Sequence, residues 1–171
     1  MYRLITRLLT RVSLGGALVA GSLLTGSTAH ADAAPQVRVV LESFTAFILE
    51  ESGHDEIYVT AQRGSSKSQK LFPQSDSYLS VAKNDCVSIR GGACPVGSRL
   101  RSFSAVNTPT YPADGQILMV TLWDDDLSGD DALVNVPLWP HPISENEYHT
   151  ENARINGYYY QLKFRLEPVW A

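Results

Sequence analysis

Alternation of apolar and polar residues near the C-terminus is the feature that most restricts what this chain can fold into. Residues 158–167 alternate strictly, and the apolar side of the pattern consists of Tyr158, Tyr160, Leu162, Phe164 and Leu166. A period of two places such residues on one face of a β-strand, whereas a helix needs a period of about 3.6. Because sustained helical periodicity is nearly absent from the rest of the chain, the sequence predicts an all-β protein.

Other segments add further strands, separated by short polar turns. The expected strands are residues 37–49, 57–61, 78–82, 86–90, 100–106, 117–123 and 133–138. Residues 117–123 are apolar almost throughout, which is typical of a central strand covered on both faces. One helical turn is expected where Ser144 and Glu147 fit a capping box. About eight strands with polar turns indicate an antiparallel β-sandwich of two sheets.

The first 31 residues have the features of a secretory signal peptide. Arg3, Arg7 and Arg11 precede an apolar stretch, and Ala29-His30-Ala31 supplies a small-x-small cleavage pattern. The apolar stretch is shorter than the ~20 residues that a membrane-spanning helix needs. We therefore expect cleavage after Ala31, a single domain over residues 32–171, and a secreted, periplasmic or extracellular protein with no transmembrane segment after cleavage.

The charge of the predicted mature chain limits its partners. Without the leader, 11 Lys and Arg face 18 Asp and Glu, a net charge of −7. Nucleic-acid binding depends largely on Lys and Arg that neutralise phosphates. The sequence therefore predicts no nucleic-acid partner.

The only two cysteines of the chain, Cys86 and Cys94, lie close together in sequence. An exported chain meets an oxidising compartment in which such a pair usually closes. The predicted disulfide closes a loop of about nine residues and contributes roughly 2.5 kcal/mol in the chain-entropy model. The spacing is not that of a redox-active or zinc-binding pair.

Five carboxylates follow the apolar strand 117–123 within eight residues, namely Asp124, Asp125, Asp126, Asp130 and Asp131. Such crowding is unfavourable, because like charges ~6 Å apart repel even in water. A rigid turn that holds them gains from a cation, and hard carboxylate oxygens select Ca²⁺ over zinc or copper. The alternative is a solvated turn, since Asp and Gly are ordinary turn residues.

A second acidic loop, residues 50–56, lies between the first two expected strands. Loops at one end of a sandwich cluster in space although they are distant in sequence. Residues 51–59, Glu-Ser-Gly-His-Asp-Glu-Ile-Tyr-Val, are similar to the acidic loop of C2 domains that ends in Asp-Pro-Tyr-Val. Residues 120–133, Val-Thr-Leu-Trp-Asp-Asp-Asp-Leu-Ser-Gly-Asp-Asp-Ala-Leu, resemble the strand, Asp-x-Asp, linker, Asp and apolar pair of that family.

The resemblance implies a C2-like antiparallel β-sandwich of eight strands and a calcium site. By resemblance, Asp124, Asp126 and Asp131 are metal ligands, and Asp55 reaches across from the other loop. Glu51 is a poorer match, because the family has Asp near that place at a longer spacing. The choice between Asp130 and Asp131 as the outer ligand stays open.

The function expected from these features is a secreted, non-enzymatic calcium-binding module, with ions held between residues 51–56 and 124–131. Anionic lipid, which many C2 domains bind through calcium, and a protein are both open as further partners. An enzyme is not indicated, because His54, His141 and His149 lack an identified nucleophile. The alternative is a metal-independent secreted interaction domain for protein or carbohydrate, with aromatic residues such as Trp139 and Trp170 as its binding surface.

Overall fold

The computed structural model describes residues 34–75, 77–126, 129–155 and 157–170. The expected leader, residues 1–31, lies outside this range, so the signal peptide and its cleavage stay predictions. The described residues form eleven strands and no helix, and hence no helix that could cross a membrane. The strands are β1 (Gln36–Ile48), β2 (His54–Arg63), β3 (Gln69–Phe72), β4 (Leu79–Ala82), β5 (Asp85–Ile89), β6 (Arg99–Phe103), β7 (Thr110–Pro112), β8 (Leu118–Asp126), β9 (Gly129–Leu138), β10 (Glu147–Ile155) and β11 (Tyr158–Val169).

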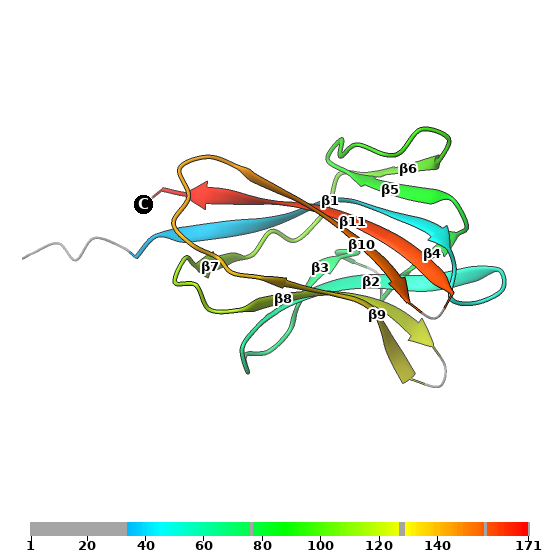
Figure 1. Ribbon diagram of the computed structural model, residues 1–171, viewed down its shortest axis with the longest axis horizontal. Helices are drawn as coiled ribbons and strands as arrows, with labels where there is room; N and C mark the ends of the chain where they lie inside the picture. Colours follow the sequence, from blue (N-terminus) through cyan, green and yellow to red (C-terminus); the bar gives the residue numbers. More distant parts are fainter. Residues whose placement is uncertain (1–33, 76, 127–128, 156, 171) are drawn as a thin grey trace, which may run out of the picture. The chain divides into compact units, whose positions relative to one another are not determined.

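The strands form two sheets stacked as the layers of a sandwich (Figure 1). The first sheet has the order β10-β11-β1-β5-β6, with β7 also paired to β1. The second has the order β3-β2-β8-β9, with β4 also paired to β2. The prediction of an all-β sandwich of two sheets is confirmed.

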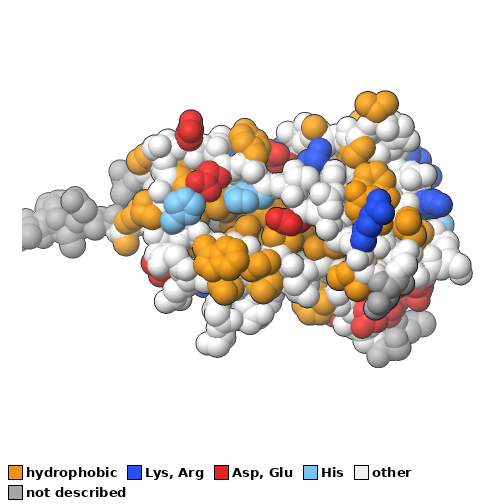
Figure 2. Space-filling view, in the orientation of Figure 1, with side chains coloured by type: hydrophobic (Ala, Val, Ile, Leu, Met, Phe, Trp, Pro, Cys, Tyr) orange, Lys and Arg blue, Asp and Glu red, His pale blue; other side chains and the backbone are white. Residues whose placement is uncertain are grey.

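The core lies between the sheets, where the alternating strands turn their apolar faces inward. Along β11 every second residue from Tyr158 to Leu166 is buried, as the period-two pattern predicts. β8 lies between β2 and β9, as predicted for a central strand. Its face with Leu118, Val120 and Leu122 is buried, but the other face is only partly covered, and Ile117 precedes the strand and is 46% exposed. Outside the core, hydrophobic side chains are scattered among polar and charged ones on the face shown in Figure 2.

Three features of the fold differ from the sequence prediction. The described residues form eleven strands, whereas about eight were expected. The helical turn expected at Ser144 and Glu147 is wrong, because Glu147 begins β10, whose nine residues pair with β11 without a register shift. That pairing satisfies backbone groups which an isolated helical turn would leave open. β5 and β6 are parallel rather than antiparallel, because the chain of residues 90–98 returns to the start of β5 through bends at Gly91 and Gly97, both of positive φ.

The predicted disulfide between Cys86 and Cys94 is confirmed, with Cα atoms 5.9 Å apart. It ties the loop after β5 back to that strand. Gly92, within the same loop, lies against the backbone of β1, and a Cβ atom added there would meet the carbonyl oxygen of Glu42 at 2.1 Å. The loop is therefore held against the first sheet by both a covalent bond to β5 and a close backbone contact with β1.

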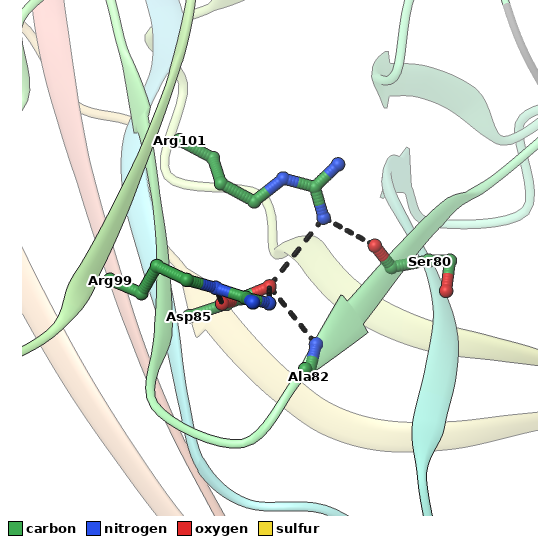
Figure 3. A network of polar contacts seen from close by, with 5 residues as sticks. All are labelled: Ser80, Ala82, Asp85, Arg99 and Arg101. Carbon is green, nitrogen blue, oxygen red and sulfur yellow. Dashed lines mark hydrogen bonds and ion pairs between the residues drawn. The ribbon is translucent and has the colours of Figure 1, made fainter.

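A polar network links the two sheets at the β4–β5 turn (Figure 3). Asp85 is fully buried and accepts hydrogen bonds from the Ala82 N–H at 3.0 Å and from Arg99 Nη2 at 2.8 Å. Arg101 pairs with the same carboxylate at 3.5 Å and also donates to the Ser80 carbonyl. Burial alone would raise the pKa of the Asp85 carboxyl, but the hydrogen bonds and the charges of the two arginines hold it below its usual value.

Candidate metal centre

The two acidic segments meet at one end of the second sheet, where β2 begins and the β8–β9 hairpin turns. In the strand register, Asp124 lies opposite Ile57 of β2 and opposite Asp131 of β9. Asp125 lies opposite Asp130. Because side chains alternate between the faces of a sheet, Asp124 and Asp131 share one face and Asp125 and Asp130 share the other.

Asp124 is the buried centre of the acidic group. Its side chain is 0% exposed, and its Oδ1 accepts a hydrogen bond from the Glu56 N–H at 2.7 Å. Its Oδ2 is buried and has no hydrogen-bond partner among the described residues. Burial is the main cause that raises the pKa of Asp124 to about 7, and the charges of Asp55, Asp126 and Glu56 add to it.

Two further carboxylates lie close to that of Asp124. Glu56, Asp124 and Asp126 each place one carboxylate oxygen so that all three lie within 4.8 Å of one another. Their position brings together β2 and β8, which are far apart in sequence. The three oxygens could therefore bind one cation.

Asp55 is fully buried and is already used by the loop that precedes it. Its Oδ2 accepts hydrogen bonds from the Glu50 N–H at 2.9 Å and from the Tyr160 hydroxyl, and its Oδ1 accepts from the Glu51 N–H at 3.2 Å. Burial and the hydrogen bond to Asp55 raise the pKa of Tyr160, so the phenol stays protonated and remains a donor. Asp55 thus anchors the start of the acidic loop through the backbone N–H groups of Glu50 and Glu51.

Glu50 and Glu51, in the loop between β1 and β2, also feel the negative charges of this group. The pKa of Glu50 is raised by burial and then by the charges of Asp131, Asp55 and Asp126. The pKa of Glu51 is raised mainly by the charge of Asp126. The structure therefore brings together an acidic cluster, defined here as Glu50, Glu51, Asp55, Glu56, Asp124, Asp126 and Asp131.

Asp130 lies apart from the cluster, on the other face of the hairpin. Its carboxylate accepts a hydrogen bond from the Tyr58 hydroxyl at 2.6 Å. The register therefore distinguishes the two aspartates that the sequence left open, with Asp131 on the side of Asp124. Leu127 and Ser128, which follow Asp126, lie outside the described residues.

Sequence reasoning missed Glu50 and Glu56 as candidate ligands. Glu56 stands next to Asp55, and simple alternation would point the two side chains in opposite directions. Only the pairing of β2 with β8, which brings the Glu56 N–H to Asp124, shows how close Glu56 lies to that carboxylate. The adjacent acidic residues in the 50–56 loop were the available signal.

The donor set fits calcium. All members of the cluster offer carboxylate oxygens, which Ca²⁺ accepts in a coordination of 6–8 ligands with loose geometry. A buried, unpaired carboxylate oxygen such as Asp124 Oδ2 is costly without a partner, and a bound cation would satisfy it.

Comparison with known proteins finds similarity of fold only. No family model and no curated protein matches the chain. Human GIVD cytosolic phospholipase A2, with a fluorophosphonate inhibitor and terbium chloride, matches with a TM-score of 0.51 and 10% identity, over 82% of this chain. This chain aligns to only 18% of that enzyme's length.

Two other solved structures are similar with lower scores. A structure described as a C2 domain matches with a TM-score of 0.47 and 12% identity, over 78% of this chain and 98% of that one. A structure of two C2 domains of extended-synaptotagmin 2 matches with a TM-score of 0.45 and 13% identity, over 97% of this chain and 48% of that one. Taken with the two-sheet architecture, the match to the phospholipase, whose TM-score is 0.51, shows that this chain has a C2-like β-sandwich fold.

Proposed function

We propose that the protein is a non-enzymatic calcium-binding module whose ion lies in the acidic cluster. The observation that carries this proposal is Asp124, a fully buried carboxylate with one oxygen unpaired and two other carboxylates within 4.8 Å of it. A solvated turn has no reason to bury a carboxylate, because water would satisfy it at the surface.

Calcium would act by joining two segments that repel each other. Asp124, Asp126 and Asp131 come from the β8–β9 hairpin, and Glu56 comes from β2. The hydrogen bonds to Asp55 hold the loop between β1 and β2 in register beneath the site. A bound Ca²⁺ neutralises the repulsion and fixes the hairpin against β2, so the ion would stabilise the folded state by mass action.

We also propose that the protein is exported. The leader-like residues 1–31 and the Cys86–Cys94 disulfide both favour an oxidising compartment. Extracellular calcium is millimolar, which fills sites with dissociation constants of about 10⁻⁴–10⁻³ M. A weak site would thus be occupied outside the cell without tight binding.

The test is thermal unfolding of the purified protein in about 2 mM Ca²⁺ and in excess chelator. A dissociation constant near 10⁻⁴ M would stabilise the fold by about 2 kcal/mol, or a few degrees in melting temperature. Mg²⁺ at the same concentration should give a smaller shift, because it requires near-ideal octahedral geometry and dehydrates reluctantly.

Two variants localise the effect. Asp126→Asn removes a carboxylate from the cluster and should abolish the calcium shift. Asp125→Asn removes the same charge from the adjacent residue on the other face of the hairpin and should retain it. Identical melting curves with calcium and with chelator would refute the proposal and would favour the metal-independent interaction domain instead.

The lipid partner is tested once calcium binding is measured. Sedimentation with phosphatidylserine vesicles, with and without Ca²⁺, compares the protein with its Asp126→Asn variant. Calcium-dependent sedimentation that the variant loses would identify anionic lipid as a ligand of the same site.

A further inference from the structure

A groove of ≈ 290 Å³ lies at the other end of β9 from the acidic cluster. Its walls include Trp139, His141, Glu147, His149 and Glu151. Figure 2 shows histidine side chains, in pale blue, near acidic and hydrophobic side chains on one face of the molecule. We call it the histidine groove.

The first imidazole of the groove faces a carboxylate. His141 Nε2 lies 3.0 Å from Glu147 Oε1, and His141 Nδ1 lies 3.1 Å from the carbonyl oxygen of Trp139. A carbonyl oxygen only accepts, so Nδ1 carries the proton in that contact. In the neutral ring Nε2 is then an acceptor that faces another acceptor. A cation, either a second proton or a metal ion, must lie between them.

The second imidazole lies against the other oxygen of the same carboxylate. His149 Nε2 is 3.8 Å from Glu147 Oε2, is buried, and has no hydrogen-bond partner among the described residues. The ring stacks on Phe164 with centroids 5.4 Å apart and planes at 16°. The stacking fixes the ring, so Nε2 is held toward Glu147 although nothing there donates to it.

The backbone presents these groups from two directions. Glu147, His149 and Glu151 alternate along β10 and therefore project from the same face of that strand. His141 comes from the segment after β9 and lies between Pro140 and Pro142, which restrict its backbone. The Pro140 carbonyl accepts a hydrogen bond from the Gly115 N–H at 2.6 Å, which fastens that segment to the fold.

We propose that the histidine groove binds a divalent transition-metal ion through His141, Glu147 and His149. Imidazole nitrogens with carboxylate oxygens suit Zn²⁺ and Cu²⁺, whereas the all-oxygen acidic cluster suits Ca²⁺. The protein would thus hold two sites of different metal preference at opposite ends of β9.

Metal binding requires one side-chain movement. Among the described residues, only Glu56, Asp124 and Asp126 already converge within 4.8 Å as a group of three. The His141 side chain, which is 56% exposed, must therefore move toward the His149 ring. This movement exchanges its present contact with the Trp139 carbonyl for one with the metal ion.

The test is titration of the purified protein with Zn²⁺ by calorimetry, in excess Ca²⁺ that fills the acidic cluster. One Zn²⁺ per chain should bind, and Co²⁺ in its place should give visible absorption bands of a site with nitrogen and oxygen ligands. His141→Gln and His149→Gln should each weaken Zn²⁺ binding by at least about tenfold, as loss of a ligand or its support does. The matched control is His54→Gln, because His54 is an exposed histidine at the acidic end of the molecule, and this variant should bind Zn²⁺ like the parent protein.

Three results would overturn the proposal. The first is no Zn²⁺ binding by the parent protein, which would mean that a proton alone bridges His141 and Glu147 in an ordinary surface ion pair. The second is unchanged affinity in His141→Gln. The third is loss of binding in His54→Gln. Since His149 packs on Phe164 and its replacement could unfold the protein, His141→Gln at its exposed position decides the case alone if necessary.

Discussion

Replacement of Asp124 by asparagine should stabilise the metal-free protein while it removes calcium binding. Asparagine keeps an oxygen that can accept from the Glu56 N–H. Its amide NH₂ would occupy the place of the orphan Oδ2, where it can donate to the neighbouring carboxylates of Glu56 and Asp126. One substitution thus removes a buried charge and supplies a missing hydrogen-bond donor.

The magnitude follows from the pKa of Asp124, which the fold raises from 3.8 to about 7. One pKa unit corresponds to about 1.4 kcal/mol, so the ionised carboxylate destabilises the folded state by up to roughly 4 kcal/mol. Below about pH 3 the group is largely protonated in both states and has little effect. As the pH rises toward 7, the unfolded chain loses this proton first, and the wild-type protein becomes progressively less stable.

The assay is urea unfolding of the wild type and of Asp124→Asn in excess chelator at pH 5 and pH 8. The variant should exceed the wild type in free energy of unfolding by up to roughly 4 kcal/mol at pH 8 and by about half of that at pH 5. Asp125→Asn is the control, since it removes an equal charge from the opposite face and should lack this pH dependence. A variant less stable than the wild type at pH 8, or a difference that does not vary with pH, would refute the reasoning.

Three further predictions concern the disulfide loop and the polar network of Asp85 at the β4–β5 turn. Gly92→Ala should lower the free energy of unfolding by roughly 1–3 kcal/mol, because its Cβ would meet the Glu42 carbonyl at 2.1 Å; unchanged urea unfolding would contradict the close contact. Cys94→Ser should lower stability by roughly 2.5 kcal/mol without changing calcium affinity, and lost calcium binding in a titration would instead implicate this loop in the site. The pKa of Asp85 is lowered in the folded state, so its carboxylate stabilises the fold at neutral pH and loses this effect as the pH falls through the folded-state pKa. Asp85→Asn should therefore reduce the free energy of unfolding at pH 7 and flatten its dependence on acid pH. An unaltered profile would show that the ion pair with Arg99 contributes nothing.

The sequence predicted the strands that bury one face in the core. It did not predict the exposed edge strand β10, which forms because it pairs with β11. The alternation from Tyr158 to Leu166 identifies β11 directly, and the short, nearly continuous apolar run 117–123 identifies β8. β10 was missed because an edge strand that is largely exposed carries little apolar periodicity, and because Ser144 and Glu147 imitate a helix start. Its nine-residue pairing with β11 overrides that local signal.

The sequence predicted which acidic segments form the candidate site, but not what each acidic side chain does there. Crowded aspartates after a buried strand indicated a cation, and the second acidic loop indicated where the rest of the site would come from. The sequence could not assign Asp55 to holding its own loop through hydrogen bonds, since this depends on Tyr160, which is distant in the chain and adjacent in space. Nor could it show that Asp130 lies away from the cluster, because the facing of each aspartate depends on the register between β8 and β9.

By itself the sequence determined the all-β class, the disulfide pair and the two acidic segments, residues 50–56 and 124–131. These follow from local periodicity, cysteine count and residue type. Only the tertiary structure decided which carboxylates share a face, which one is left buried with an unpaired oxygen, and that two histidines meet one glutamate in a groove at the far end. Strand pairing brings together residues dozens of positions apart, and a shift of register by one residue would send each of these side chains to the opposite face.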